Sequence, residues 1–190
     1  MKIKGTSIIG FIIIFSFLSS CTSTRYITQT KRSGVEQLLI TRAIDRSLAK
    51  IDNLYVNGSR VFIDITSLAP DEAVYLKGAL TQWFLENGAT VVDERGKADL
   101  IASVLVKCVG TDRIEAGLSI PSLPVPFTGI FTPKVNILTI DRQKGYSEMD
   151  IIIYSAKTGK FKQKVDSLIG KARFDIFTIL LIPVPSSNIY

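Results

Sequence analysis

Histidine is absent from all 190 residues of the chain. Without imidazole there can be no Ser-His or Cys-His catalytic pair, no histidine-ligated metal and no histidine pH switch. Cysteine is nearly as scarce, with only Cys21 and Cys108. Cys108 lies in an apolar run, residues 100–109, where a small buried side chain is expected and no base is available to activate the thiol. We therefore expect no enzymatic activity and no metal centre.

Signals for nucleotide and nucleic-acid binding are also missing. Residues 158–160, Thr-Gly-Lys, contain the Gly-Lys pair of a phosphate loop but lack its upstream glycine and its following Ser or Thr. Lys and Arg outnumber Asp and Glu by 23 to 17, and the basic residues are scattered. This pattern predicts no cofactor, no nucleic-acid partner and no small-molecule substrate, but it leaves contact with anionic lipid open.

The first 21 residues have the features of a secretion signal. Lys2 and Lys4 precede an apolar run, residues 8–18, that is shorter than the roughly 17–25 residues of a membrane-spanning helix. Residues 18–21, Leu-Ser-Ser-Cys, resemble the lipobox of bacterial lipoproteins. The resemblance implies cleavage before Cys21, attachment of a diacylglycerol to its sulfur and acylation of the new amine. Plain secretion and an uncleaved anchor are the alternatives.

A lipid on Cys21 would hold the protein on a membrane, stably so with more than one acyl chain. Thr22 follows the cysteine, where Asp favours retention in the inner membrane in the lipoproteins that this sequence resembles. The resemblance therefore implies the cell envelope, at the periplasmic face of the outer membrane. We expect residues 1–20 to be the signal peptide, residues 21–32 a polar tether without regular structure and residues 33–190 one folded domain.

The sequence of residues 33–190 predicts an α/β domain with two main helices and a mixed sheet of five or six strands. Ser33 and Glu36 form a capping-box pattern before an amphipathic helix over residues 34–51, which packs on the sheet or, alternatively, lies on a membrane surface. Pro70 and Gly88 delimit a second helix. The first two strands should be parallel, and the first buried on both faces. Strands are expected at residues 60–66, 89–92, 100–109, 146–155, 161–167 and 174–184.

Residues 117–133 interrupt this pattern with four prolines and no charge. The prolines preclude a regular helix or central strand, and a long uncharged loop in a compact domain is often functional. If the loop is exposed, its large apolar side chains form a binding surface for another envelope protein, a second copy of the chain or a membrane; if it is packed, they cover the core. The candidate partner-binding residues are Ile120, Leu123, Val125, Phe127, Ile130 and Phe131.

A few acidic residues are the nearest approach to a catalytic or metal site. Three of them cluster near a strand end, where they could bind a hard cation or act as a carboxylate pair, although solvated turn residues commonly look the same. Asp64 lies within an apolar strand and, if buried, would need Arg60 or Lys97 as a partner. The clustered acids are Asp93, Glu94 and Asp99.

Several segments resemble bacterial envelope lipoproteins with a small α/β domain. They are residues 59–65 (Ser-Arg-Val-Phe-Ile-Asp-Ile), residues 89–93 (Ala-Thr-Val-Val-Asp), residues 97–103 (Lys-Ala-Asp-Leu-Ile-Ala-Ser) and the hairpin at residues 156–159. The chain is similar to uncharacterised lipoproteins of this kind. More distantly it resembles the curli-secretion lipoprotein, penicillin-binding-protein activator lipoproteins and the N-terminal part of TolB. The resemblance implies an envelope protein that binds proteins rather than catalysing a reaction.

Overall fold

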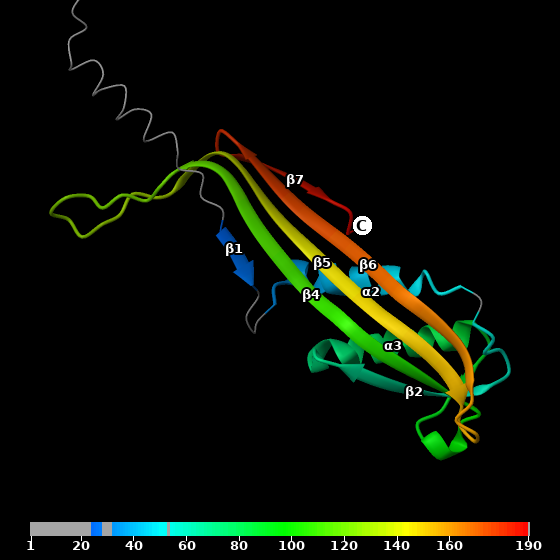
Figure 1. Cartoon of the computed structure of the whole chain (residues 1–190). Coiled ribbons are helices and arrows are strands. Elements are labelled where there is room, and N and C mark those ends of the chain that lie inside the picture. Colours follow the sequence, from blue (N-terminus) through cyan, green and yellow to red (C-terminus); the bar gives the residue numbers. More distant parts are fainter. Residues whose placement is uncertain (1–23, 28–31, 53, 190) are drawn as a thin grey trace, which may run out of the picture. The chain divides into compact units, whose positions relative to one another are not determined.

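The computed structural model describes residues 24–27, 32–52 and 54–189. The expected signal peptide, residues 1–20, and the expected lipidation site, Cys21, lie outside them. The predicted α/β class, with two main helices and a mixed sheet, is confirmed (Figure 1). The elements are β1 (Thr24–Ile27), α2 (Gly34–Leu48), β2 (Arg60–Ser67), α3 (Pro70–Glu86), β3 (Thr90–Val91), a 3-10 turn (Arg95–Lys97), β4 (Leu100–Ile120), β5 (Val135–Ser155), β6 (Phe161–Ile179) and β7 (Ile182–Ser187).

All of these strands belong to one sheet, in the order β3-β2-β4-β5-β6-β7, with β1 also paired to β4. β2 is parallel to both of its neighbours, with Val61 opposite Val91 of β3 and Leu100 of β4. The predicted parallel alignment of β2 and β3 is confirmed, and it follows from the helical crossover between them. β1 lies within residues 22–32, so the expectation of no regular structure there is wrong for these four residues.

Helix α2 starts where the capping box predicts. The Glu36 amide donates to the Ser33 hydroxyl at 3.3 Å, and the Ser33 amide donates to the Glu36 carboxylate at 2.8 Å. The helix ends at Leu48, three residues before the predicted end. Packing on the sheet, rather than on a membrane, is confirmed because its apolar stripe is buried. The buried apolar residues of α2 are Leu39, Ile40, Ala43, Ile44 and Leu48.

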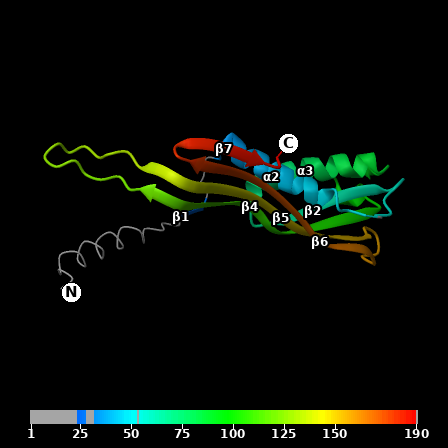
Figure 2. The ribbon, with the colours of Figure 1, turned by 90° about the horizontal axis from the view of Figure 1, so that it is seen from above.

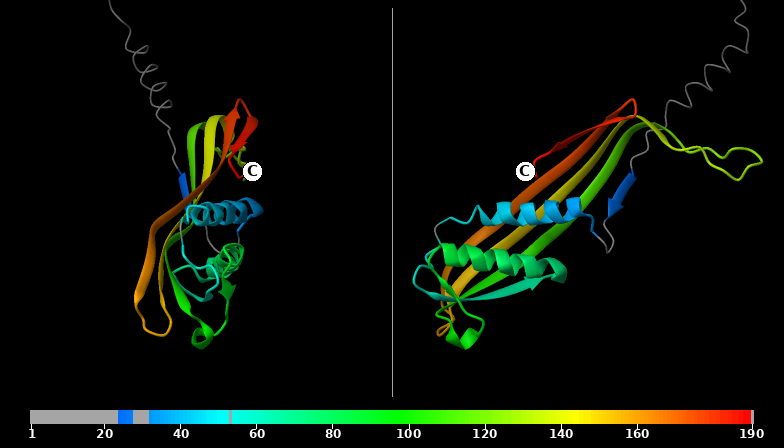
Figure 3. Two further views of the ribbon diagram at one scale, coloured as in Figure 1. Left: turned by 90° about the vertical axis from the view of Figure 1, so that its right-hand side faces the viewer. Right: turned by 180° about the vertical axis from the view of Figure 1, so that it is seen from behind.

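Helix α2 approaches the sheet closely at two glycines. A Cβ on Gly145 of β5 would lie 2.3 Å from the Leu39 carbonyl oxygen, and one on Gly170 of β6 would lie 1.7 Å from the Ala43 carbonyl oxygen. Real Cβ atoms do not come this close to backbone, so only glycine fits. The two glycines therefore let α2 lie against β5 and β6, beside α3 on the same face of the sheet (Figure 3).

Helix α3 begins at Pro70 and is followed by Gly88, whose φ of +78° favours glycine, as predicted. Leu76, Leu80 and Phe84 of α3 are buried in the main core. No helix among the described residues is long and apolar enough to cross a bilayer. Residues of α2 belong to the same core, and the strands contribute to it mainly through Val61, Ile63, Ala102, Val104, Val106, Met149, Ile151 and Ile153.

The expectation that β2 is buried on both faces is wrong. Val61 and Ile63 are buried, whereas Phe62 and Asp64 are partly exposed. Parallel strands are buried on both faces when helices cover both sides of the sheet. Here both helices lie on one face, so β2 alternates between core and solvent (Figure 3).

Three strands are longer than predicted. β4 and β5 each have 21 residues and β6 has 19. The predicted last strand over residues 174–184 is wrong, because β6 ends at Ile179 and a turn at Leu180 and Leu181 leads into β7. Both turn leucines have positive φ, 47° and 72°. This backbone suits a two-residue hairpin turn, but Asn or Gly is the residue usually found there, so two leucines are not recognisable as a turn signal.

The chain falls into two compact units, and β4, β5 and β6 contribute residues to both. We call the first the helical unit; it contains both helices and the apolar core. We call the second the strand-end unit; it contains the far ends of the long strands, the β4–β5 loop and most of β7. The helical unit is residues 27–112, 143–174 and 187–190, and the strand-end unit is residues 1–26, 113–142 and 175–186.

Candidate functional site

The loop predicted at residues 117–133 is the end of the β4–β5 hairpin. β4 continues to Ile120 because residues 117–120 hold no proline, so the irregular segment is residues 121–134. Gly117 allows β4 to continue close beside β5. Its φ is +142°, and a Cβ there would lie 2.2 Å from the Leu138 carbonyl oxygen of β5. The loop extends beyond the ends of both strands (Figures 1 and 2).

Backbone hydrogen bonds order this loop into a narrow hairpin. The Thr132 amide donates to the Leu123 carbonyl at 2.8 Å, and the Val125 amide donates to the Ile130 carbonyl at 2.8 Å. The Leu123 amide also donates to the Thr132 hydroxyl at 2.9 Å. These bonds hold the loop without any contribution from the apolar core, whose residues all lie elsewhere.

The tip of this hairpin holds a phenylalanine in a strained conformation. The Thr128 amide and hydroxyl both donate to the Val125 carbonyl, at 3.4 and 3.0 Å, which closes a turn over Pro126 and Phe127. Pro126 suits the first of the two central positions of this turn. The second central position has positive φ and is usually occupied by Gly or Asn in such turns. Phe127 sits there with φ of +64° and a fully exposed ring. Strain of this kind in a bulky residue commonly marks a functional position.

All six candidate partner-binding residues are exposed. The fractions range from 38% for Val125 to 109% for Phe127. Of the two alternatives left by the sequence, an exposed loop or one packed on the core, the structure has the exposed loop. Ile120 differs from the expectation in one respect, since it ends β4 rather than belonging to the loop.

A second apolar tip, which the sequence analysis missed, belongs to the same unit. The Leu180 amide at the β6–β7 turn donates to the Ile137 carbonyl of β5 at 2.7 Å. Leu180, Leu181 and Ile182 are 65–71% exposed. Residues 176–190 carry no charge, as do residues 116–133. This second uncharged run is the signal that could have identified the tip.

The described strand ends and loop of the strand-end unit expose their large apolar side chains. In residues 113–142 and 175–186, fifteen large apolar side chains are exposed and none is buried, the only buried residue being Asp175. The described residues of the helical unit, although more numerous, include nine such exposed side chains. Contiguous apolar surface is rare on monomeric soluble domains and typically marks an interaction site.

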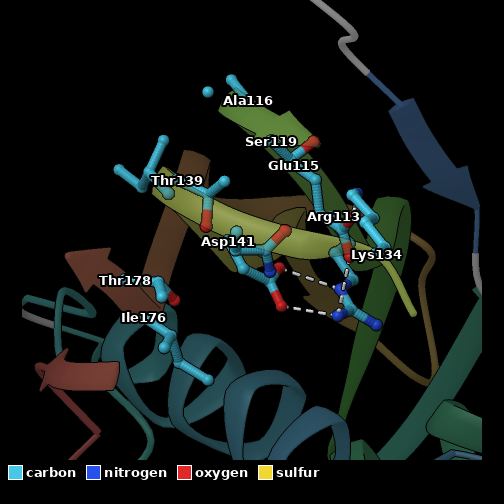
Figure 4. Close-up of a pocket in the computed structure, with 12 residues that line it drawn as sticks. Arg113, Glu115, Ala116, Ser119, Lys134, Thr139, Asp141, Ile176 and Thr178 are labelled. Carbon is cyan, nitrogen blue, oxygen red and sulfur yellow. Dashed lines mark hydrogen bonds and ion pairs between the residues drawn. The ribbon is translucent and has the colours of Figure 1, made fainter. Parts of the chain in front are cut away.

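The charged residues of residues 113–142 and 175–186 pair with one another. Arg113 binds Asp141 through two hydrogen bonds of 2.9 and 2.5 Å, and also lies 3.1 Å from Glu115 (Figure 4). Lys134 lies 3.9 Å from Glu115, and the Arg142 guanidinium binds the buried Asp175 carboxylate at 3.0 and 3.3 Å. Three cations thus balance three anions, and the surface of these segments has no net charge to attract a charged partner.

A hollow of about 190 Å³ lies beside the Arg113–Asp141 pair (Figure 4). Because side chains alternate along a strand, Arg113, Glu115 and Ser119 of β4 point to this hollow, while Ile114 and Leu118 lie on the opposite face. Both carboxylates of the hollow are held by cations. This arrangement links β4 to β5 through paired charges.

Two of the three acids considered as a cation site or a carboxylate pair are likewise held by cations. Asp99 accepts two hydrogen bonds from the Arg60 guanidinium, at 3.0 and 2.9 Å, and these hold its pKa down at about 2. Glu94 pairs with Lys97 at 2.8 Å. Asp93 belongs to the same turn, and no facing pair of carboxylates forms among these three in the described interactions. A carboxyl group that stays ionised to about pH 2 cannot act as a general acid near neutrality.

Asp64 does not meet the condition under which it would need a buried partner, because its side chain is 46% exposed; its recorded ion-pair partner is Arg95, at 4.0 Å. It faces away from the single helix-covered side of the sheet. The expectation that Cys108 is buried is wrong, because this residue is exposed. Val104 and Val106, four and two residues earlier in β4, are buried, so the buried run on this face of β4 ends just before the cysteine.

No cluster of three or more Cys, Asp or Glu side chains suitable for a metal ion occurs in residues 24–27, 32–52 and 54–189. The hollow beside Arg113 and Asp141 is lined by paired charges. The uncharged hairpin end is a surface where exposed apolar side chains gather, and its chemistry is that of apolar contact.

Comparison with known proteins adds little. No protein-family profile and no curated protein matches the sequence. Among solved structures, a neuraminyllactose-binding hemagglutinin homolog from Helicobacter pylori is similar over 73% of this chain and 71% of its own, at 12% identity and a TM-score of 0.25. A likeness this weak supports no inference about fold or function.

Proposed function

We propose that this protein is a membrane-anchored bacterial lipoprotein that acts without catalysis, as an accessory or assembly factor of the cell envelope. The proposed anchor is a lipid on Cys21, at the periplasmic face of the outer membrane. The proposed working surface is the β4–β5 loop, which contacts another envelope protein or a second copy of the chain. No cofactor, small-molecule substrate or nucleic acid takes part in this function.

The observation that carries the proposal is the tip of the loop. Phe127 is fully exposed in a strained turn, and residues 116–133 around it carry no charge. An aromatic side chain on a narrow projection fits a pocket on a partner, and aromatic anchors of this kind contribute much of the energy of protein interfaces. Strain and exposure at one apolar residue both cost stability, which argues for a role outside the folding of this chain.

Photo-crosslinking in native envelopes tests this function. A photoreactive amino acid at Phe127 should yield a discrete crosslinked protein, whereas the same amino acid at Leu68, which is 96% exposed on the helical unit, should not. Replacing residues 121–134 with Asn-Gly should abolish co-purification of that protein without changing membrane partitioning. Equal crosslinking at both positions, or unchanged partner recovery, would refute a partner site in the loop.

A second candidate function is an oligomeric secretion or pore component that inserts this loop into the membrane. The observation that favours it is the second tip, because Leu180 and Leu181 add an exposed apolar turn to the same unit. Two uncharged tips can enter hydrocarbon without the cost of burying a charge. A strictly monomeric mass in mild detergent would count against this candidate and leave the first one standing.

A further inference from the structure

Five basic residues of the helical unit line two hollows that share Lys171, and we call these five residues together the cationic edge. Arg46 and Lys50 of α2, with Lys171 of β6, line one hollow. Lys171 lines a second hollow together with Lys144 of β5 and Arg173 of β6. The Arg46 guanidinium donates to the backbone carbonyls of Lys171, at 2.7 Å, and of Asn188, which also lines the second hollow. The two hollows are therefore adjacent parts of one surface.

None of these five cations forms an ion pair with a carboxylate in the described part of the chain. Other basic residues of the sheet do: Lys107 lies 2.9 Å from Asp150, and Arg60 lies 2.9 Å from Asp99. The next acid along β6, Asp175, is bound by Arg142. The cationic edge therefore keeps its charge, and that charge attracts an anion from solution.

Part of this surface is held in place by backbone contacts. Besides the two bonds from Arg46, the Lys50 ammonium donates to the Ile169 carbonyl of β6 at 2.6 Å. Carbonyl oxygens satisfy donors but do not neutralise a full charge. The Lys171 ammonium lies 6.0 Å from the centre of the Tyr146 ring, so an aromatic side chain lies beside the cations. Amphipathic rings beside basic residues are common where a protein meets the headgroup layer of a membrane.

We propose that the cationic edge binds the phosphate groups of an anionic lipid surface. The second hollow, about 210 Å³, is large enough for one headgroup phosphate. The five cations spread over two open hollows instead of converging on one enclosed pocket. This arrangement suits an extended array of phosphates better than a single free ion, and juxtaposed basic residues bind anionic leaflets in this way. The edge lies in the helical unit, so the inference stands apart from the partner role of the loop.

The test measures how the full-length chain distributes between neutral phosphatidylcholine vesicles and vesicles that also contain phosphatidylglycerol. Apolar anchoring, by a lipid or by the N-terminal apolar run, contributes to both and cancels in the ratio. The wild type should prefer the anionic vesicles by about tenfold or more at low salt, and the preference should fall as salt rises. The triple variant Lys144→Gln, Lys171→Gln, Arg173→Gln should lose most of this preference.

A matched control removes the same charge from the β5–β6 hairpin, as Lys157→Gln, Lys160→Gln, Lys162→Gln. It should keep the preference of the wild type. Equal loss in both triple variants would mean that only net charge matters and would overturn the site. Competition by millimolar inorganic phosphate would indicate a small-ion site instead of a lipid surface, and would overturn the proposal as well.

A single variant tests the site in case the triple variant fails to fold. Lys171 is exposed and lines both hollows, so Lys171→Glu should lower the anionic preference while thermal unfolding stays unchanged. An unchanged preference in Lys171→Glu would contradict the proposal. Crosslinking at Phe127 is measured separately. The lipid-binding proposal for the cationic edge and the partner-binding proposal for the β4–β5 loop can therefore fail independently.

Discussion

The carbonyl oxygen of Ala43 in α2 lies 1.7 Å from the point that a Cβ on Gly170 of β6 would occupy. Gly170→Ala must therefore push the helix away from the sheet. We expect it to lower the free energy of unfolding by about 1–3 kcal/mol, as overpacked cores do. Gly78→Ala on α3 is the matched control: its Cβ meets nothing within 4 Å, so it should add about 0.5–1 kcal/mol. Urea unfolding measures both, and equal effects would contradict the close packing.

The Arg142–Asp175 pair should be far more important for stability than the surface pairs. Asp175 is 1% exposed, and Arg142 supplies two hydrogen bonds to its carboxylate. Arg142→Ala leaves that charge buried without its partner, which typically costs about 3–5 kcal/mol. Lys97→Ala, which breaks the exposed pair with Glu94, should change stability by about 0.5 kcal/mol or less. Similar losses in the two variants would show that the Asp175 carboxylate has another partner.

Acid should weaken the fold partly through Asp99. Hydrogen bonds from Arg60 lower the pKa of this carboxyl from 3.8 to about 2 in the folded chain. The folded state thus holds the proton less tightly than the unfolded chain, so the stabilisation is present above about pH 3.8 and is lost as the pH falls towards 2. Thermal unfolding should show a smaller drop between these pH values in Asp99→Asn. A drop equal to that of the wild type would exclude this contribution.

Phe127→Gly separates the folding of the loop from its proposed role. Glycine tolerates the φ of +64°, so the relief of strain offsets the added entropy of the unfolded chain, and stability should stay within about 0.5 kcal/mol. Co-purification of the partner should nevertheless be lost with the ring. In Gly129→Ala, where φ is +69°, a side chain enters a strained position and should destabilise by about 1 kcal/mol. Retained partner binding in Phe127→Gly would place the contact elsewhere.

The helices were predictable because their ends carry local chemical signals. Ser33 with Glu36, and Pro70 with Gly88, mark boundaries that the structure reproduces within a few residues. These signals depend on bonds between neighbours in the chain, so a sequence contains them in full. The parallel pairing of β2 with β3 was predictable for a related reason, since a helical crossover restricts the direction of the second strand.

The extensions of the long strands were not predictable, because distant residues make them possible. Arg113 and Asp141 are 28 positions apart, and each alone looks like a solvated loop residue. Paired across β4 and β5, they let both strands continue. The β6–β7 turn was missed because Leu180 and Leu181 occupy positions where glycine or asparagine is usual. The exposed site residues of the β4–β5 loop were identified by their prolines and lack of charge, but the sequence could not distinguish exposure from packing.

Residues 113–142 and 175–186 keep their strands in register with no apolar side chain buried among them. Backbone ladders without such burial open readily, so amide protons there should exchange with deuterated solvent much sooner than those of the helical unit. Any surface that covers these segments in the cell would slow that exchange. Comparing deuterium uptake in intact envelopes with that of the purified chain would therefore locate the covered amides before the covering molecule has been identified.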